Sequence, residues 1–296
     1  MDIRLNKILN LIKKKDLISA KRLCYQAKNL EDNSHFQNTF GYLLYDSGEI
    51  DEAIKKWQTT IKIDPNYFYA FNNLGNAYAK KGEFDKAEDS FKKAIVIKPD
   101  YFDACYSLGN TQFKISKFDD ALLNLDKAIN LRPGYEPALR SRVMLLRKMS
   151  RDKEALETLN NLISINPTDA ELLFSKGQLL SNLGRKNEAI TSYKNTYLID
   201  QNFPFILGYL VEAKLANCEW QNINQEFEEI KRKLSKQEKV CPPLIISNFC
   251  DSPYLQSLAA KIWNKKNKKS EMIDFNIDDK KETINVAYFS ADFRDH

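Results

Sequence analysis

Apolar residues recur along most of the chain with the period of an amphipathic helix. In residues 69–78 they fall at i, i+3, i+4 and i+7. The residues on this face are Phe71, Leu74, Gly75 and Tyr78. A second stretch with the same period starts near Phe84, and Gly82 lies before it and Pro99 just beyond its end. Glycine and proline at these places are typical of helix ends, so the pattern predicts two short helices joined by a tight turn.

The same pair of stretches returns every 34 residues. Proline occupies one phase of this period, at Pro65, Pro99, Pro133 and Pro167. Alanine occupies another without a miss, at Ala53, Ala87, Ala121, Ala155 and Ala189. Glycine occupies two more, at Gly41, Gly75, Gly109 and Gly177 and at Gly48, Gly82 and Gly184. Such a register predicts tandem helical hairpins that stack on their neighbours as a solenoid.

The period and its order of small, aromatic and proline positions resemble the tetratricopeptide repeat (TPR) signature. The resemblance implies five repeats over residues 34–203 and a degenerate TPR-like helical pair over residues 1–33. The aromatic slot of the second helices holds Trp57, Phe91, Leu125, Leu159 and Tyr193, which we interpret as core. We expect close interhelical contacts between the small residues, Gly41 with Ala53 and Gly75 with Ala87. The fourth repeat departs from the signature.

Two substitutions mark that departure. Val143 stands where the other repeats have glycine, and Arg142 stands where leucine is expected.

Composition narrows the class of protein. The 296 residues carry 45 Lys+Arg against 40 Asp+Glu, a formal net charge of +5. The 17 Phe, 14 Tyr and 3 Trp exclude wholesale disorder, and nine Gly with nine Pro exclude collagen-like or turn-rich all-β chains. Five scattered cysteines without a CxxC pair argue against a disulfide framework or a zinc site. The charged start and the lack of an apolar run of about 18 residues lead us to expect a cytoplasmic protein.

The period fails after Gln201. We expect capping or connector helices over residues 204–264 and a polar linker over residues 265–283. Residues 284–289 are β-branched and aromatic, which predicts a buried strand followed by a loop to residue 296. A lone strand cannot satisfy its ladder hydrogen bonds, so we interpret residues 284–296 as the start of a truncated α/β domain. The expected fold class is all-α, a TPR α-solenoid with a helical C-terminal cap and one trailing β-strand.

Three segments after the repeats carry a second resemblance: Cys218-Glu219-Trp220, Pro242-Pro243 with the later Asp251-Ser252-Pro253, and Ser290-Ala291-Asp292-Phe293-x-x-His296. Together with the repeats, they resemble the protein O-linked N-acetylglucosamine (O-GlcNAc) transferases, especially bacterial members. The resemblance implies that the trailing strand belongs to an incomplete glycosyltransferase domain. It also implies transfer of N-acetylglucosamine from uridine diphosphate N-acetylglucosamine (UDP-GlcNAc) to Ser or Thr of proteins, with no further cofactor and no metal.

Within that family the histidine of this loop lies at the active site. The resemblance therefore assigns His296 as a candidate catalytic base or acceptor-orienting group. The groups that hold the donor diphosphate belong to a second lobe for which the chain has no residues, so we expect the chain alone to be inactive. The alternative is a stand-alone TPR adaptor that binds peptides and catalyses nothing.

The groove of the repeats is expected to bind protein or peptide partners. Known members of the family carry an asparagine two residues before the repeat glycine, which clamps a peptide backbone. This slot holds Thr39, Asn73, Ser107, Ser141 and Ser175. Only Asn73 can form the bidentate contact, because a hydroxyl reaches less far and binds one group. The sequence predicts peptide binding without the asparagine ladder.

Other partners are not expected. The lysine runs at residues 13–15, 231–233 and 265–269 lack interleaved aromatics, so we interpret them as solvated faces or linker rather than a nucleic-acid site. No membrane association is predicted, and a homodimer through the solenoid is an open alternative.

Overall fold

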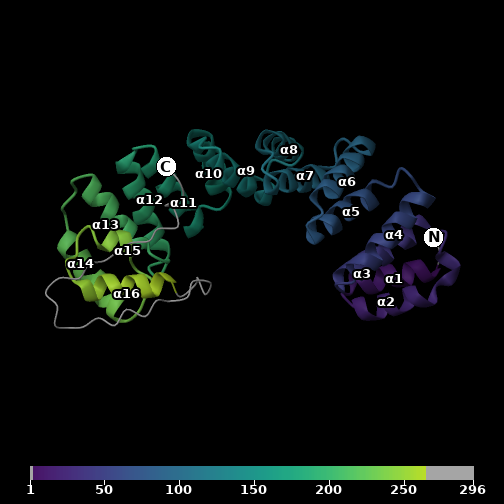
Figure 1. Ribbon diagram of the computed structural model, residues 1–296, viewed down its shortest axis with the longest axis horizontal. Coiled ribbons are helices and arrows are strands. Elements are labelled where there is room, and N and C mark those ends of the chain that lie inside the picture. Colours follow the sequence, from purple (N-terminus) through teal and green to yellow (C-terminus); the bar gives the residue numbers. More distant parts are fainter. Residues whose placement is uncertain (1–2, 265–296) are drawn as a thin grey trace. The chain divides into compact units, whose positions relative to one another are not determined.

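The computed structural model describes residues 3–264, and within this range every regular element is a helix (Figure 1). The predicted all-α fold with paired helices is confirmed over these residues. The predicted linker, the predicted strand over residues 284–289 and His296 lie outside the described residues.

The chain forms two compact units, one of residues 1–165 and one that begins at Asn166. The first contains α1 (Ile3–Lys13), α2 (Leu17–Gln26), the 3-10 turn η1 (Lys28–Leu30), α3 (Ser34–Asp46), α4 (Ile50–Ile63), α5 (Phe68–Lys81), α6 (Phe84–Ile97), α7 (Phe102–Lys114), α8 (Phe118–Leu131), α9 (Glu136–Lys148) and α10 (Asp152–Ile165). The second contains α11 (Ala170–Asn182), α12 (Lys186–Ile199), α13 (Ile206–Ala216), α14 (Ile223–Ser235), α15 (Pro243–Ile246) and α16 (Pro253–Asn264).

The turn inside each repeat uses a left-handed backbone conformation. Gly82 ends α5 with φ +80°, a value that glycine adopts without steric cost. The equivalent turns of the third and fourth repeats hold Ser116 with φ +61° and Ser150 with φ +56°. A side chain in this region costs roughly 1 kcal/mol, so these two turns are less favourable than the glycine turns.

Each typical repeat closes where a first-helix glycine meets a second-helix ring. A Cβ atom on Gly75 would lie 2.5 Å from the ring of Phe91, and one on Gly41 would lie 2.6 Å from Nε1 of Trp57. The repeat alanine is fully buried in both cases, but the ring one helical turn further on extends over the glycine and supplies its nearest atoms. In the third repeat an added Cβ on Gly109 would lie 3.1 Å from the backbone oxygen of Ala121, so the expected contact of glycine with the repeat alanine is confirmed there.

The fourth repeat closes without a glycine. Val143 on α9 and Leu159 on α10 are both buried. Arg142 contacts both neighbouring second helices, because its Nε donates to Asp126 Oδ1 at 2.6 Å on α8 and its guanidinium also donates to Thr158 on α10. The arginine that departs from the signature thus forms a polar bridge across the repeat.

A buried carboxylate joins the second and third repeats. Glu88 on α6 is 4% exposed, and its oxygens accept from Lys117 Nζ at 2.7 Å, Lys92 Nζ at 2.8 Å and Gln112 Nε2 at 3.1 Å. Burial by itself would raise the pKa of Glu88, but the hydrogen bonds from Lys117, Lys92 and Gln112 outweigh it and lower the pKa to about 2. The amide of Gln112 also accepts from Asn124 Nδ2 at 2.8 Å, so the network reaches α8.

The second unit continues with α11 and α12 as a repeat hairpin, followed by the helices expected as a cap. Its core includes Leu207, Val211 and Ile230, and Gly208 packs against Cys241, whose Cα would lie 2.8 Å from an added Cβ. Helix α16 begins with Pro253 as expected, and the Ser252 hydroxyl accepts from the Leu255 amide at 3.4 Å. These helices confirm the expected helical character of residues 204–264; the predicted domain boundaries stay predictions.

Two lysines of the second unit are buried. Lys214 on α13 is 4% exposed and forms an ion pair with Glu226 on α14. Lys233 is 8% exposed and donates to the backbone carbonyl of Gln201 at 3.2 Å. The interpretation of residues 231–233 as a solvated run was therefore wrong for Lys233, because its stem packs inside the unit while its ammonium binds a carbonyl.

Candidate functional site

One face of the first unit is formed by the first helices of its repeats. Helix α5 contacts α3 and α7, and α7 contacts α9, so these helices lie side by side (Figure 1). Residues at i, i+4, i+7 and i+11 of each helix point away from the glycine side that meets the second helix. On α5, α7 and α9 they are Tyr69, Asn73, Asn76, Lys80, Asp103, Ser107, Asn110, Lys114, Pro137, Ser141, Met144 and Lys148. We call these positions, with the equivalent ones on α3, the open face.

The expected groove residues lie on this face in part. Thr39, Asn73, Ser107 and Ser141 occupy successive first helices of the first unit, and Ser175 lies on α11 in the second unit. Thr39 is buried, and its hydroxyl donates to a carbonyl of its own helix at 2.8 Å.

The amide of Asn73 already has a partner. Its Nδ2 donates to Asn38 Oδ1 at 3.0 Å, and the backbone carbonyl of Asn38 accepts from Trp57 Nε1 at 3.2 Å. This bond uses one N–H of the Asn73 amide and links the first and second repeats, while the second N–H and Oδ1 remain for a peptide backbone. The other positions of the slot hold threonine or serine, so the ladder of clamping asparagines is not present on this face.

Tyrosine residues mark the start of the first helices at 34-residue spacing. Tyr67, Tyr101 and Tyr135 are the N-cap residues of α5, α7 and α9. Each packs against rings on the first helix of the preceding repeat. The ring of Tyr101 lies 5.0 Å from Phe68 and 5.5 Å from Tyr69, and that of Tyr135 lies 5.2 Å from Phe102 and 5.3 Å from Tyr106. We call these seven rings the aromatic row; they join one repeat to the next.

Charged groups border the aromatic row. Arg132 lies 5.0 Å above the ring of Phe102 and 5.2 Å above that of Tyr135. Burial raises the pKa of Asp103, and Arg132 opposes this shift. Burial, with Asp103 and Tyr69 nearby, also raises the pKa of Tyr101. The row is therefore a packing surface that joins neighbouring repeats.

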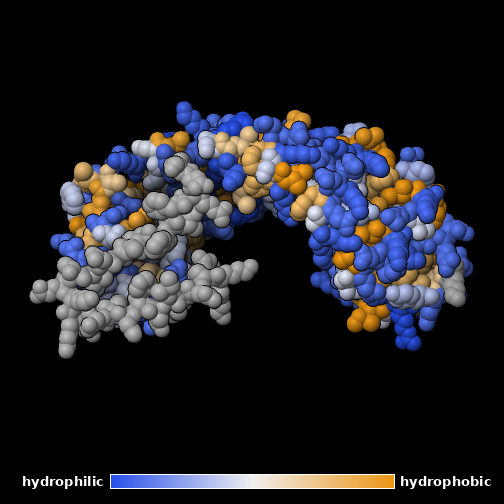
Figure 2. All heavy atoms as spheres, in the orientation of Figure 1, coloured by the Kyte–Doolittle hydropathy of each residue, from blue (hydrophilic) through white to orange (hydrophobic). Residues whose placement is uncertain are grey.

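Three large apolar side chains are exposed on the otherwise polar open face. Tyr42 is 45% exposed, Tyr69 is 47% exposed and Met144 is 61% exposed. The visible surface of the molecule is largely hydrophilic with scattered apolar spots (Figure 2). Aromatic rings and methionine are the side chains that protein interfaces most often use as adaptable apolar contacts.

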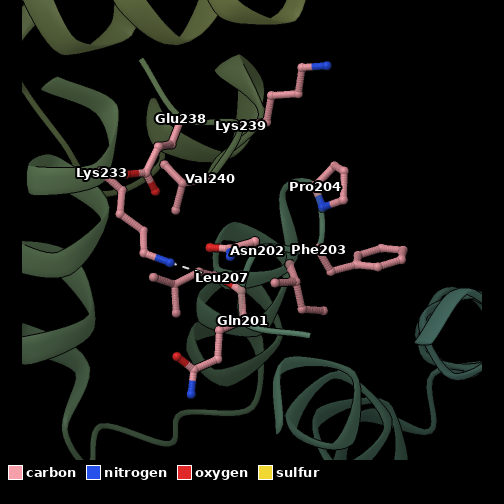
Figure 3. A pocket seen from close by; sticks show the side chains of 10 residues that line it. Gln201, Asn202, Phe203, Pro204, Leu207, Lys233, Glu238, Lys239 and Val240 are labelled. Atoms are coloured by element: carbon pink, nitrogen blue, oxygen red, sulfur yellow. Dashed lines mark hydrogen bonds between the residues drawn. The ribbon is translucent and has the colours of Figure 1, made fainter. Parts of the chain in front are cut away.

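Two cavities of the second unit are lined in part by residues of α13. The first, of about 280 Å³, is lined by residues 201–204, 206–207 and 238–240 together with Lys233, whose ammonium points to the Gln201 carbonyl (Figure 3). The second, of about 390 Å³, lies between α12, α13 and α14. There the Tyr197 hydroxyl donates to Glu229 Oε1 at 3.1 Å. Glu226, which also lines the second cavity, forms an ion pair with Lys214.

Between residues 3 and 264, no group of His, Cys, Asp and Glu is placed to hold a metal ion. Cys24, Cys105, Cys241 and Cys250 are buried free thiols, and Cys218 is exposed. Burial raises the pKa of the Cys24 thiol to about 12, which makes it unreactive at neutral pH. None of the helices described is long and apolar enough to span a bilayer.

Comparison with known proteins identifies the repeats. Tetratricopeptide repeat families match residues 41–82, 68–101 and 158–191. The crystal structure of MamA shares 27% identity over 54% of this chain and 94% of its own, with a TM-score of 0.51. No curated protein matches the sequence.

Two further crystal structures share the fold. That of YrrB, titled a TPR protein with an unusual peptide-binding site, is 21% identical over 60% of this chain and 91% of its own, with a TM-score of 0.53. That of a TPR protein from Parabacteroides merdae is 18% identical over 88% of this chain and 98% of its own, with a TM-score of 0.54. The described chain is an all-helical TPR solenoid. These matches concern the repeats and carry no indication of an O-GlcNAc transferase.

The aromatic row and the lysines of the open face were not predicted from the sequence. The signal was present, because Tyr67, Tyr101 and Tyr135 keep the same 34-residue spacing as the prolines. Spacing alone does not distinguish a ring that joins two repeats from one that lies within a single hairpin, and the contacts between neighbouring first helices make that distinction.

Proposed function

We propose that the protein is an interaction scaffold and that the open face of its first unit binds an extended segment of a partner protein. The observation that carries the proposal is the exposure of Tyr42, Tyr69 and Met144 on a face built from successive repeats. Tyrosine and methionine are enriched at protein interfaces relative to the rest of the surface. The TPR fold and the peptide-binding site named for YrrB support the same function.

The open face also offers polar groups for a peptide backbone. Asn76, two turns after Tyr69 on α5, and Asn110 on α7 lie on the open face and are partly exposed. Each amide supplies donors and an acceptor, which an extended segment without internal hydrogen bonds needs. The rigid repeats hold these groups in place, so binding costs little ordering of the scaffold.

Selection from a displayed library of random peptides against the full chain tests the proposal. Tyr69→Ala with Met144→Ala should weaken the selected peptides about tenfold, because both contacts are removed. The matched control is Val96→Ala with Leu123→Ala, two side chains of similar exposure, 79% and 70%, on second helices. Equal loss in both variants, or no selected peptide at all, would contradict binding at the open face.

A second candidate function is recruitment of substrates for glycosyl transfer. It is favoured by Ser290-Ala291-Asp292-Phe293-x-x-His296, which lies outside the described residues. A transfer assay with radiolabelled UDP-GlcNAc and captured partner proteins distinguishes the two functions. The scaffold function predicts no label on the partner. Label that is lost in His296→Ala would establish transferase activity and a role for the histidine.

A further inference from the structure

Three lysines occupy one position of the repeat at the end of the open face. Lys80, Lys114 and Lys148 are 34 residues apart and lie in the last turns of α5, α7 and α9. All three are exposed. We call them the lysine column. In the first repeat the same position holds Asp46, so the column begins with the second repeat.

The lysine column differs from its neighbours in having no carboxylate partner. Lys81, the next residue along α5, binds Asp51 at 2.7 Å and Glu83 at 3.2 Å. The three column lysines make no ion pair with any residue between 3 and 264. Two ammonium groups instead lie near rings, Lys80 at 4.6 Å from Tyr45 and Lys114 at 5.9 Å from Phe84. A ring supports the ammonium without neutralising its charge.

A lysine at a helix end interacts favourably with the helix dipole, and this alone accounts for basic residues in last turns. It does not account for their position. Lys81 and Arg147 are also last-turn residues, yet only the column position recurs on the open face in all three repeats. The recurrence places three uncompensated positive charges along one edge of the proposed binding surface.

On the helices that carry the lysine column, negative charge on the open face lies far from this edge. On α5, α7 and α9 the face carries one carboxylate, Asp103, at the start of α7. It is eleven residues before Lys114, which at 1.5 Å per residue is about 16 Å along the helix. Arg132 lies close enough to Asp103 to oppose the rise of its pKa. The edge is therefore cationic on α5, α7 and α9, and Asp46 at the equivalent position of α3 marks where the lysine column ends.

We infer that the open face selects acidic partner segments in the polyproline II conformation, with a carboxylate at every third residue. This inference rests on the proposed function. Helices in contact pack at about 8–10 Å, so the column offers one ammonium per such interval. A polyproline II segment has three residues per turn and rises about 3.1 Å per residue, so residues i, i+3 and i+6 face one side about 9 Å apart. An extended β-strand would place i and i+3 on opposite sides.

Fluorescence anisotropy with synthetic peptides and the full chain tests this. The probes are a labelled twelve-residue peptide of four Glu-Pro-Ala units, the same peptide with Gln for Glu, and one of the same composition with its four glutamates clustered. We expect the first to bind about tenfold tighter than the second, with affinity falling as salt rises. The clustered peptide should bind less tightly than the first.

A matched pair of variants assigns the effect to the column. Lys80→Glu, Lys114→Glu and Lys148→Glu together should abolish the preference for Glu over Gln. The control is Lys62→Glu, Lys153→Glu and Lys261→Glu, three exposed lysines on α4, α10 and α16 with the same charge change. Circular dichroism confirms that both variants fold.

The possible failures are distinguishable. Equal binding of the Glu and Gln peptides, or equal loss in the control, would overturn the inference while leaving the proposed function intact. Absence of binding by every peptide would overturn both.

Discussion

The second and fourth repeats close the same helical hairpin with different side chains. In the second repeat α5 meets α6 through Gly75 beneath the ring of Phe91. In the fourth repeat the equivalent residues are Val143 and Leu159, and both are buried. A pair of branched aliphatic side chains fills the space that a ring fills above a glycine. The two repeats therefore use different residues to fill the equivalent space between their helices, because protein interiors are close-packed.

Each of these repeats also carries one charged residue at a position that is apolar in the other. Glu88 stands where the fourth repeat has Leu156, and Arg142 stands where the second has Leu74. Both charges bind groups from adjacent repeats, Glu88 through Lys117 and Arg142 through Asp126. A departure from the repeat pattern is thus compensated by a neighbour, which is possible because each repeat contacts only the next.

The largest expected effect concerns Glu88. Its pKa is about 2 in the folded chain and 4.5 for an unperturbed glutamate, so the unfolded chain binds more protons between these values. The stabilisation, about 3 kcal/mol, is complete above pH 4.5 and is lost as the pH falls toward 2. Urea unfolding at pH 6 and pH 3 measures this. Glu88→Gln should flatten the dependence; an unchanged slope would contradict the buried network.

The glycine–ring contact gives the next largest effect. Gly75→Ala places a methyl group within 2.5 Å of Phe91 and should destabilise the first unit by about 2 kcal/mol. Adding Phe91→Leu, which imitates the fourth repeat, should recover part of the loss. Urea denaturation of the wild type, both single variants and the double variant measures the coupling. Strictly additive losses would show that the ring and the glycine do not contact.

The arginine bridge of the fourth repeat has a smaller effect. Arg142→Ala removes the bonds to Asp126 and Thr158 and should cost about 1 kcal/mol. Arg142→Leu should cost less, because leucine is the residue that the second and third repeats place at this position, as Leu74 and Leu108. Arg147→Ala, at an exposed residue of the same helix, is the control for thermal unfolding. Equal midpoints for Arg142→Ala and Arg147→Ala would count against the bridge.

The turns give the smallest effect, in the stabilising direction. Ser150 adopts φ +56° where the second repeat has Gly82. Ser150→Gly should stabilise the first unit by about 0.5 kcal/mol, since the relief of the left-handed strain exceeds the added chain entropy. A midpoint below that of the wild type would show that the serine turn is not strained.

Much of the fold could be predicted from the sequence. The alanine and proline phases located the hairpins, and the rings in the aromatic slot are buried as expected, including Trp57 and Tyr193. The contact of Gly75 with the ring of Phe91 was not predicted. The position of a residue within the repeat predicts which face of its helix the residue occupies. Which side chain contacts the glycine depends on the angle at which the two helices cross.

The candidate site was predicted less well. Of the slot expected to bind peptide, Thr39 is buried and Asn73 is bonded to Asn38 across repeats. The aromatic row and the lysine column follow the same period but were recognisable only once the first helices had been placed side by side. His296 and the predicted strand lie beyond the described residues, so their roles stay predictions.

The sequence by itself determined the period, the helical hairpins and the faces that each hairpin buries, because these follow from local spacing of apolar residues and from glycine at the turns. Only the tertiary structure decided which charged residues are buried. Glu88, Lys214 and Lys233 look like surface charges in the sequence, yet each is buried with partners from other helices. A charge can be buried only where distant groups converge on it, and that convergence is a property of the packed chain.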